Sequence, residues 1–314
     1  PETLYLSTNG RFLYVTQPTL NQMSMIAAKT GQVLCTAHVP GNPSYMTFDP
    51  VTSSLFVAGN QGTTVSNISL SNCQVLHTIA TQGPIYGLAA VDIAPGISQN
   101  QLWVAGKTGI TILDTKTRQT LAAIPLPGTP RSLTCPPGSW GYVTTRQGGL
   151  YAIDPGAHRV LSLLSGGQFG TMDFDQVTGE VYVPDSLHHQ LDVIVPPDPS
   201  RPTPSPEPGY VYHLSAAPLS VAITSDGAFG LVALSTGRVA LLDLAGRQVS
   251  NTFNVGGDPH FVITGLYPPV LGTTPQQAFL ADTVSNVAIY LLVALVVLLP
   301  FWFVWRRSRK QKKA

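Results

Sequence analysis

A pattern of about forty residues repeats along most of this 314-residue chain. Each copy contains four short runs rich in Val, Ile, Leu, Thr and Tyr, and Gly, Pro, Asn or Asp separates each run from the next. The copies span residues 4–43, 44–84, 85–130, 131–168, 169–218 and 219–259, and a partial copy covers 260–269. A repeat of this period restricts the chain to architectures that stack one unit many times.

Four strands per copy predict the blades of a β-propeller. A four-stranded sheet has two apolar faces, and packing each blade against two neighbours buries both. A solenoid of hairpins and a β-sandwich are the alternatives, but a sandwich does not normally repeat its pattern six times. We therefore expect an all-β propeller over 1–269. Seven blades are preferred, with the missing strands preceding Pro1, and six are the alternative.

The repeat also contains recognisable sequence motifs, NGRFLYVT at Asn9–Thr16 and KTGQVL at Lys29–Leu34. Shorter matches are Val181–Val183, Ile112–Asp114, Leu241–Asp243 and Val255–Pro259. These segments resemble the YVTN-type β-propeller family, which is related to WD-repeat and lactonase-like propellers. The resemblance implies the fold but no single activity, because such propellers serve as surface proteins, enzyme subunits and docking modules. It further implies structural, turn-capping roles for four aspartates near the ends of third strands: Asp114, Asp154, Asp192 and Asp243.

The segment 287–305 reads VAIYLLVALVVLLPFWFVW and carries no charge. At ~1.5 Å per residue, a helix of this length crosses a hydrocarbon core. The tail 306–314 follows with six cations, an arrangement typical of a stop-transfer helix with its basic side in the cytoplasm. A buried core helix is the alternative. We expect a linker over 270–286, a single C-terminal transmembrane helix and a basic cytoplasmic tail.

The predicted membrane collar combines an aromatic belt with the first cations of the tail. Its residues are Trp302, Trp305, Arg306, Arg307, Arg309 and Lys310. This orientation places the propeller on the extracellular or periplasmic side of the plasma membrane of a prokaryote. Such a chain needs an export signal, which we expect to have preceded Pro1.

Charge and motifs exclude several functions for the large domain. Of 17 cations, six lie in the tail, so residues 1–305 hold 11 cations against 16 acids and offer no nucleic-acid footprint. No nucleophile elbow, zinc-protease helix, P-loop or dinucleotide fingerprint occurs. The adjacent His188 and His189 fit surface turn residues better than a chelating pair. We therefore expect no catalytic residues, no metal and no cofactor.

Three cysteines, Cys35, Cys73 and Cys135, allow one disulfide and leave at least one thiol unpaired within the chain. The sequence does not choose the pair.

A proline-rich insertion at 196–208 reads PPDPSRPTPSPEP, in place of a tight turn in the fifth copy. Such a run favours stiff polyproline II structure. It is either a solvated loop or a projecting arm that docks on another subunit, with Pro196, Arg201 and Pro208 as the arm's candidate residues.

Together, these features predict a membrane-tethered propeller that binds other proteins, as an accessory subunit of a larger membrane complex. One alternative is an enzyme with a site at the central opening, of lactonase or quinoprotein type. Another is a cell-surface adhesion or layer protein. An enzyme of that kind requires convergent acids, histidines or a metal at the central opening, and the sequence shows no such cluster.

Overall fold

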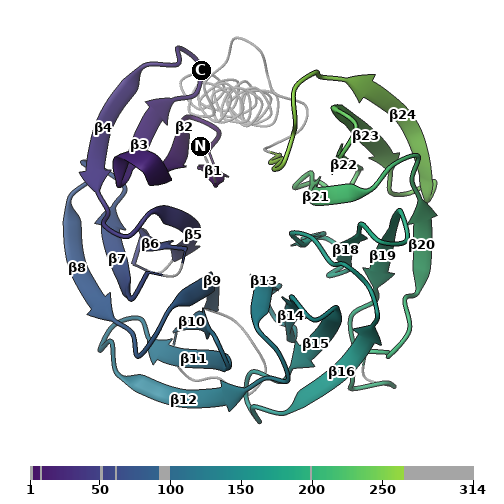
Figure 1. The fold of residues 1–314 in the computed structure, drawn as a ribbon, viewed down its shortest axis with the longest axis horizontal. Helices are drawn as coiled ribbons and strands as arrows, with labels where there is room; N and C mark the ends of the chain where they lie inside the picture. Colours follow the sequence, from purple (N-terminus) through teal and green to yellow (C-terminus); the bar gives the residue numbers. More distant parts are fainter. Residues whose placement is uncertain are drawn as a thin grey trace, which may run out of the picture. The chain divides into compact units, whose positions relative to one another are not determined.

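The computed structural model describes residues 3–264, except 8, 50–51, 61, 92–99 and 199. These residues form six antiparallel four-stranded sheets, the blades of a β-propeller, arranged around a centre (Figure 1). All six lie in the unit Pro1–Tyr267. The fold class expected from the repeats is therefore confirmed as an all-β propeller with six blades.

Each of the first three blades takes its four strands in chain order, from the centre to the perimeter. Blade 1 comprises β1 (Leu4–Leu6), β2 (Phe12–Gln17), β3 (Gln22–Ala27) and β4 (Val33–His38). Blade 2 comprises β5 (Pro43–Asp49), β6 (Ser54–Gly59), β7 (Thr64–Ser69) and β8 (Val75–Ala80). Blade 3 comprises β9 (Ile85–Val91), β10 (Gln101–Gly106), β11 (Gly109–Asp114) and β12 (Thr120–Pro125).

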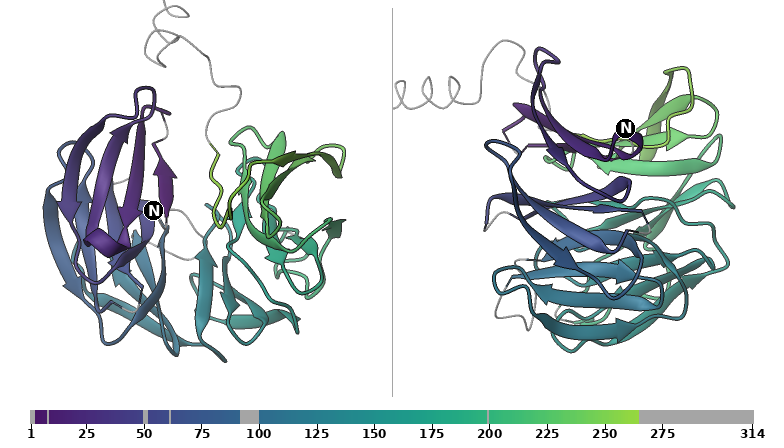
Figure 2. Two further views of the ribbon diagram at one scale, coloured as in Figure 1. Left: turned by 45° about the horizontal axis from the view of Figure 1, so that its top comes forward. Right: turned by 60° about the vertical axis from the view of Figure 1, so that its left-hand side comes forward.

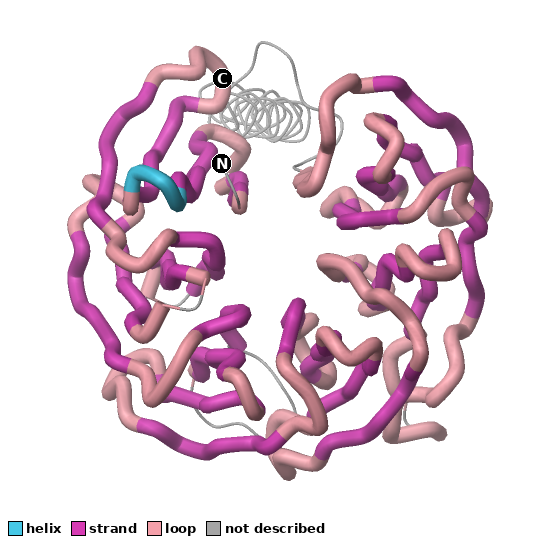
Figure 3. Tube along the Cα trace, in the orientation of Figure 1, coloured by secondary structure: helices cyan, strands magenta, loops and turns pink. Residues whose placement is uncertain are grey.

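The last three blades follow the same order. Blade 4 comprises β13 (Pro130–Thr134), β14 (Gly141–Thr145), β15 (Gly149–Ile153) and β16 (Val160–Ser165). Blade 5 comprises β17 (Asp173–Phe174), β18 (Val181–Asp185), β19 (Gln190–Ile194) and β20 (Tyr210–His213). Blade 6 comprises β21 (Pro218–Ile223), β22 (Phe229–Leu234), β23 (Arg238–Asp243) and β24 (Gln248–Asn254). The helical structure among the described residues is one 3-10 turn, η1 (Pro18–Leu20) (Figure 3).

Burial follows the position of a strand within its blade. The second and third strands are the most buried, as in β6, where all six residues are inside. The outermost strands expose most of their residues, as β8 does. The tilted views show neighbouring sheets lying face to face (Figure 2). The apolar cores therefore lie between blades, where alternate residues of each strand meet the next sheet.

A recurring turn joins the third and fourth strands of several blades. Asp114 accepts a hydrogen bond at Oδ1 from the backbone N–H of Lys116 at 2.9 Å, and Asp154 accepts one from Ala157 at 2.9 Å. In both turns the residue four positions after the aspartate has a positive φ. Asp243 likewise accepts from the N–H of Gly246 at 3.0 Å. The turn-capping role is thus confirmed for these three aspartates.

Asp192 departs from this pattern. It is 3% exposed within β19 and accepts a hydrogen bond from Nε2 of Gln190 at 2.8 Å. The prediction of a turn cap is wrong here, because β19 leads into the proline-rich insertion and there is no tight turn for the carboxylate to cap.

The six blades correct the preference for seven. The partial seventh copy begins at residue 260. Within the described part of the chain, residues 260–264 form no strand and join no sheet. No helix among the described residues is long and apolar enough to span a membrane. The predicted linker, transmembrane helix and basic tail lie beyond residue 264, outside the described residues.

A disulfide joins Cys35 of β4 to Cys73, in the turn before β8, so it links blade 1 to blade 2. Cys135 is free. The structure therefore selects one of the three pairings that the sequence allows.

Candidate functional site: the seam and the channel cavity

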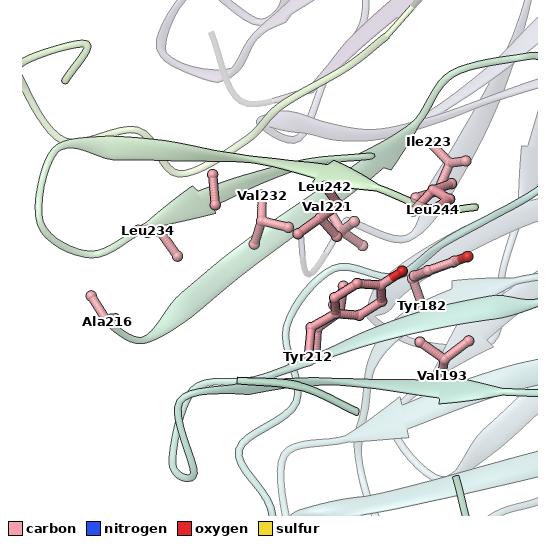
Figure 4. Close-up of a cluster of buried hydrophobic side chains, with 12 residues drawn as sticks. Tyr182, Val193, Tyr212, Ala216, Val221, Ile223, Val232, Leu234, Leu242 and Leu244 are labelled. Carbon is pink, nitrogen blue, oxygen red and sulfur yellow. The ribbon is translucent and has the colours of Figure 1, made fainter. Parts of the chain in front are cut away.

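Five buried apolar clusters connect the six blades in sequence. Each cluster takes residues from two consecutive blades, from blades 1 and 2 through to blades 5 and 6. In the last of these, three residues of blade 5 face three residues of blade 6 (Figure 4): Tyr182, Val193 and Tyr212 face Val221, Val232 and Leu242. Among the described residues, no such cluster joins blade 6 to blade 1. We call the two faces that bound this position the seam.

Phe253 marks the seam on the outermost strand of blade 6. It pairs in register with Val239 of the third strand. Four other blades have an equivalent pair, in which a residue of the outermost strand lies opposite a residue of the third strand: Ala37 and Met23, Ile79 and Val65, Ile124 and Ile110, and Tyr212 and Leu191. Those four outer residues are 2–7% exposed, since each packs against the following blade. Phe253 is 45% exposed. The position that normally meets the next blade is therefore apolar and uncovered in blade 6.

Several further residues of this face are apolar. Along β23, Ala240 and Leu242 point to blade 5 and are buried. Their neighbours Val239 and Leu241 point to the opposite face and are half-buried. Leu231 pairs with Leu241 and is half-buried too. The seam side of blade 6 is thus a sheet face of the kind that the other blades bury.

Blade 1 presents the second face of the seam. Tyr14 and Met25 point to blade 2 and belong to the shared cluster. Leu13 and Ile26, paired across β2 and β3, point the other way and are half-buried. Both faces of the seam therefore carry apolar side chains that would contact an inserted sheet.

The segment Phe261–Thr264 lies along the inner end of the seam. Its Val262 N–H donates to Oγ of Ser220 in β21 at 3.1 Å. The same kind of contact connects other innermost strands: Ala90 N–H to Thr47 at 3.0 Å, Met172 N–H to Ser132 at 3.3 Å and Ile223 N–H to Asp173 at 2.8 Å. The segment therefore takes the place of an innermost strand beside blade 6, without strands outside it among the described residues.

The centre of the propeller holds a second feature, the channel cavity, with a volume of about 600 Å³. The innermost strands of several blades line it, and its basic and acidic residues are Arg131, Arg146, Asp258 and His260. Asp258 is paired with His260, at 3.0 Å between Oδ2 and Nε2. The two arginines are neighbours in blade 4, because Arg131 lies in β13, Arg146 directly follows β14, and Pro130 pairs with Thr145.

A smaller cavity of about 370 Å³ lies between β1, β17, β21 and the segment Phe261–Thr264. Asp173 lines it, and burial raises the pKa of this carboxyl to about 6, although the hydrogen bond from Ile223 N–H acts to lower it.

Near the rim of blade 5, Asp185 accepts a 2.6 Å hydrogen bond from His188 and raises the pKa of that imidazole.

The Asp173 carboxyl gives a pH prediction. A carboxyl whose pKa is raised by folding favours the folded state while it is protonated and loses that contribution as the pH rises through about 6. Asp173→Asn keeps an acceptor for the Ile223 N–H without the charge. We expect this variant to be more stable than the wild type by about 1–2 kcal/mol at pH 8 and equal to it at pH 3.5, measured by urea unfolding.

Asp226→Asn is the control. The hydroxyl of Thr224 donates to Asp226 and lowers the pKa of its carboxyl, so the pH dependence of stability has the opposite sign. This variant should lose stability at pH 8 relative to pH 3.5. Equal responses of the two variants would contradict the assignment of a raised pKa to Asp173.

The residues predicted from the sequence are placed as follows. Pro196, Arg201 and Pro208 lie between β19 and β20, where Pro196 and Pro208 are half-buried against blade 5 and Arg201 is exposed. The six collar residues lie outside the described residues. His188 is exposed, as expected of a turn residue. Within the described ranges, no three His, Cys, Asp or Glu side chains are grouped so that they could hold a metal ion.

Sequence reasoning missed Phe253, Arg131 and Arg146. The repeat register could have identified Phe253 as a position that faces the next blade. For the arginines no sequence signal exists, since nothing local shows that they line one cavity.

No protein-family model matches this sequence, and no curated protein matches it. Solved structures match its fold. The β-propeller domain of Cps50 (Swd1) from Myceliophteria thermophila superposes with a TM-score of 0.69 at 14% identity, over 85% of this chain and 89% of that one. Kuenenia stuttgartiensis hydrazine synthase superposes with a TM-score of 0.57 at 16% identity, over 78% of this chain and 76% of that one. At such identities the likeness shows the β-propeller fold alone.

Proposed function

We propose that this protein is a membrane-tethered, extracytoplasmic β-propeller that binds another protein, as an accessory subunit of a larger membrane complex. The observation that carries the binding role is the seam, where two apolar sheet faces have no described partner. Phe253 is exposed there beside half-buried apolar residues, and exposed apolar patches are typical of interaction sites. The apolar segment 287–305 and its basic collar support the tether.

The shape of the seam favours a partner protein that presents a β-sheet. Phe253 occupies the register position that other blades bury against a sheet, and Phe261–Thr264 already occupies the innermost place. The partner should therefore present a β-sheet whose apolar side chains contact the two seam faces, as the sheets of neighbouring blades contact each other. A tether to the bilayer raises the effective concentration of the propeller beside such a membrane protein.

Site-specific photo-crosslinking tests the proposal in the native membrane. A photoreactive phenylalanine at position 253 should crosslink to one other polypeptide in stoichiometric amount, which mild-detergent purification and mass spectrometry then identify. The matched control places the same group at Leu121, an exposed outer-strand residue of blade 3 at 38% exposure. Control crosslinks should be at least about tenfold fewer, as expected of a residue outside an interface core.

The same experiment can overturn the proposal. Crosslinks from position 253 to residues 265–314 would show that the chain fills its own seam, and crosslinks to a second copy would show self-association. A lone monomer without crosslinks would shift the function towards a surface protein or an enzyme.

In a separate prediction, Phe253→Ser should release the partner during purification while leaving the propeller folded. Replacing a central aromatic anchor typically costs about 2 kcal/mol or more of binding free energy, roughly a thirtyfold loss of affinity. Leu121→Ser should retain the partner. Equal retention by both variants in quantitative mass spectrometry would place the interface elsewhere.

A further inference from the structure

Two guanidinium groups line the channel cavity side by side. Arg131 is the second residue of β13, and Arg146 directly follows β14, its antiparallel partner. The backbone N–H of Arg146 donates to the carbonyl oxygen of Thr129 at 2.8 Å, which holds the two chain segments together. Both side chains line the same cavity of about 600 Å³, a volume within the range of small-molecule sites.

Neither arginine is neutralised by the described residues. The ion pairs among these residues are His188 with Asp185 and His260 with Asp258. Asp258 also lines the cavity, but its carboxylate lies against His260 and is exposed. Both side chains are exposed to the solvent of the cavity. Burial of part of the Arg131 side chain and then the charge of Arg146 lower the pKa of Arg131, so the two cations lie close enough to repel each other. An anion between them would relieve this repulsion.

The ring of Tyr86 holds Arg146 in place. The guanidinium carbon of Arg146 lies 5.5 Å from the ring centroid of Tyr86, a cation–π contact, and Tyr86 lines the same cavity. A cation–π contact does not require the guanidinium to donate a hydrogen bond to another protein group. No hydrogen bond from either guanidinium to another described residue is present, so the donors of both groups are available.

We infer that the channel cavity binds a small anion that carries a phosphate or carboxylate group, with Arg131 and Arg146 as its ligands. A guanidinium matches either group through two parallel hydrogen bonds. Two neighbouring arginines of blade 4 would hold such a group from two sides. This inference is independent of the partner that we propose for the seam.

Equilibrium dialysis with radiolabelled inorganic phosphate and with citrate tests the site, using the full chain in detergent at constant ionic strength. The wild type should bind one anion saturably. Arg131→Gln and Arg146→Gln should each weaken binding at least about tenfold, as loss of a charged hydrogen-bonding partner does. Comparing the two probes distinguishes a phosphate ligand from a carboxylate ligand.

Arg159→Gln is a matched control, because the Arg159 guanidinium lies 5.4 Å from the ring centroid of Trp140 yet does not line the cavity. Its binding should be unchanged. If a glutamine variant does not fold, as judged by circular dichroism, Arg131→Lys and Arg146→Lys replace it and should bind more weakly than the wild type, because lysine lacks the bidentate fork. Non-saturable binding by the wild type, or equal losses in Arg159→Gln, would overturn the inference.

Discussion

Replacing Trp103 with alanine is expected to lower the free energy of unfolding by about 4 kcal/mol. Trp103 lies in β10, is fully buried, and belongs to the cluster between blades 3 and 4. Its Nε1 donates to Oε1 of Gln101 at 2.8 Å, so truncation also leaves a buried acceptor without its donor. Urea unfolding of the full chain in detergent, followed by far-ultraviolet circular dichroism, measures the change.

Gly141 shows how closely the indole is packed. A Cβ added at Gly141 would lie 2.6 Å from Cζ3 of Trp103 and 3.1 Å from Sγ of Cys135. Gly141→Ala should therefore destabilise the wild type by about 1–3 kcal/mol through overpacking. In the background of Trp103→Ala, the same substitution should cost less, because the cavity accepts the new methyl group. Additive losses in the double variant would contradict this packing, since residues in contact are expected to couple.

Removal of the Cys35–Cys73 disulfide should have an effect of similar size. The two cysteines are separated by 38 residues, and opening a loop of that length releases chain entropy worth about 4 kcal/mol in the unfolded state. The bond also ties blade 1, which has a described neighbour on one side only, to blade 2. Cys35→Ala/Cys73→Ala should therefore lower the denaturation midpoint strongly.

The thiol of Cys135 provides the control. It is free and half-buried, and burial raises the pKa of the thiol above the usual range, which lowers the fraction of reactive thiolate. Cys135→Ala should keep the response of the wild type to a reducing agent, whereas the double variant should lose that response. A double variant as stable as the wild type would show that blade 1 is held by its apolar cluster alone.

The seam relates these stability arguments to function. Blades 2 to 5 bury both faces against described neighbours, and each gains stability from two interfaces. Blades 1 and 6 each share an apolar cluster with one described neighbour only, so a bound sheet would contribute to their folding as well as to recognition. Partner binding should therefore raise the stability of the terminal blades more than that of the central ones, which hydrogen exchange can resolve by blade.

Local patterns were sufficient to predict the blades. Alternating apolar residues, turn residues and a forty-residue period are properties of short stretches, and they indicated four strands in each of the six copies. The aspartate turns were predictable for the same reason, because Asp114, Asp154 and Asp243 contact backbone groups within three residues. Asp192 was not, since the proline-rich insertion replaces the turn that its position implies.

Contacts between distant segments were decided by the tertiary structure. The disulfide partner of Cys35, the approach of Arg131 to Arg146 and the exposure of Phe253 all depend on how blades and strands pack. Strand register follows from alternation, so a sequence can show that a residue faces a neighbouring blade. It cannot show whether a neighbour is present, because burial is a property of two surfaces and the sequence of one blade describes only its own.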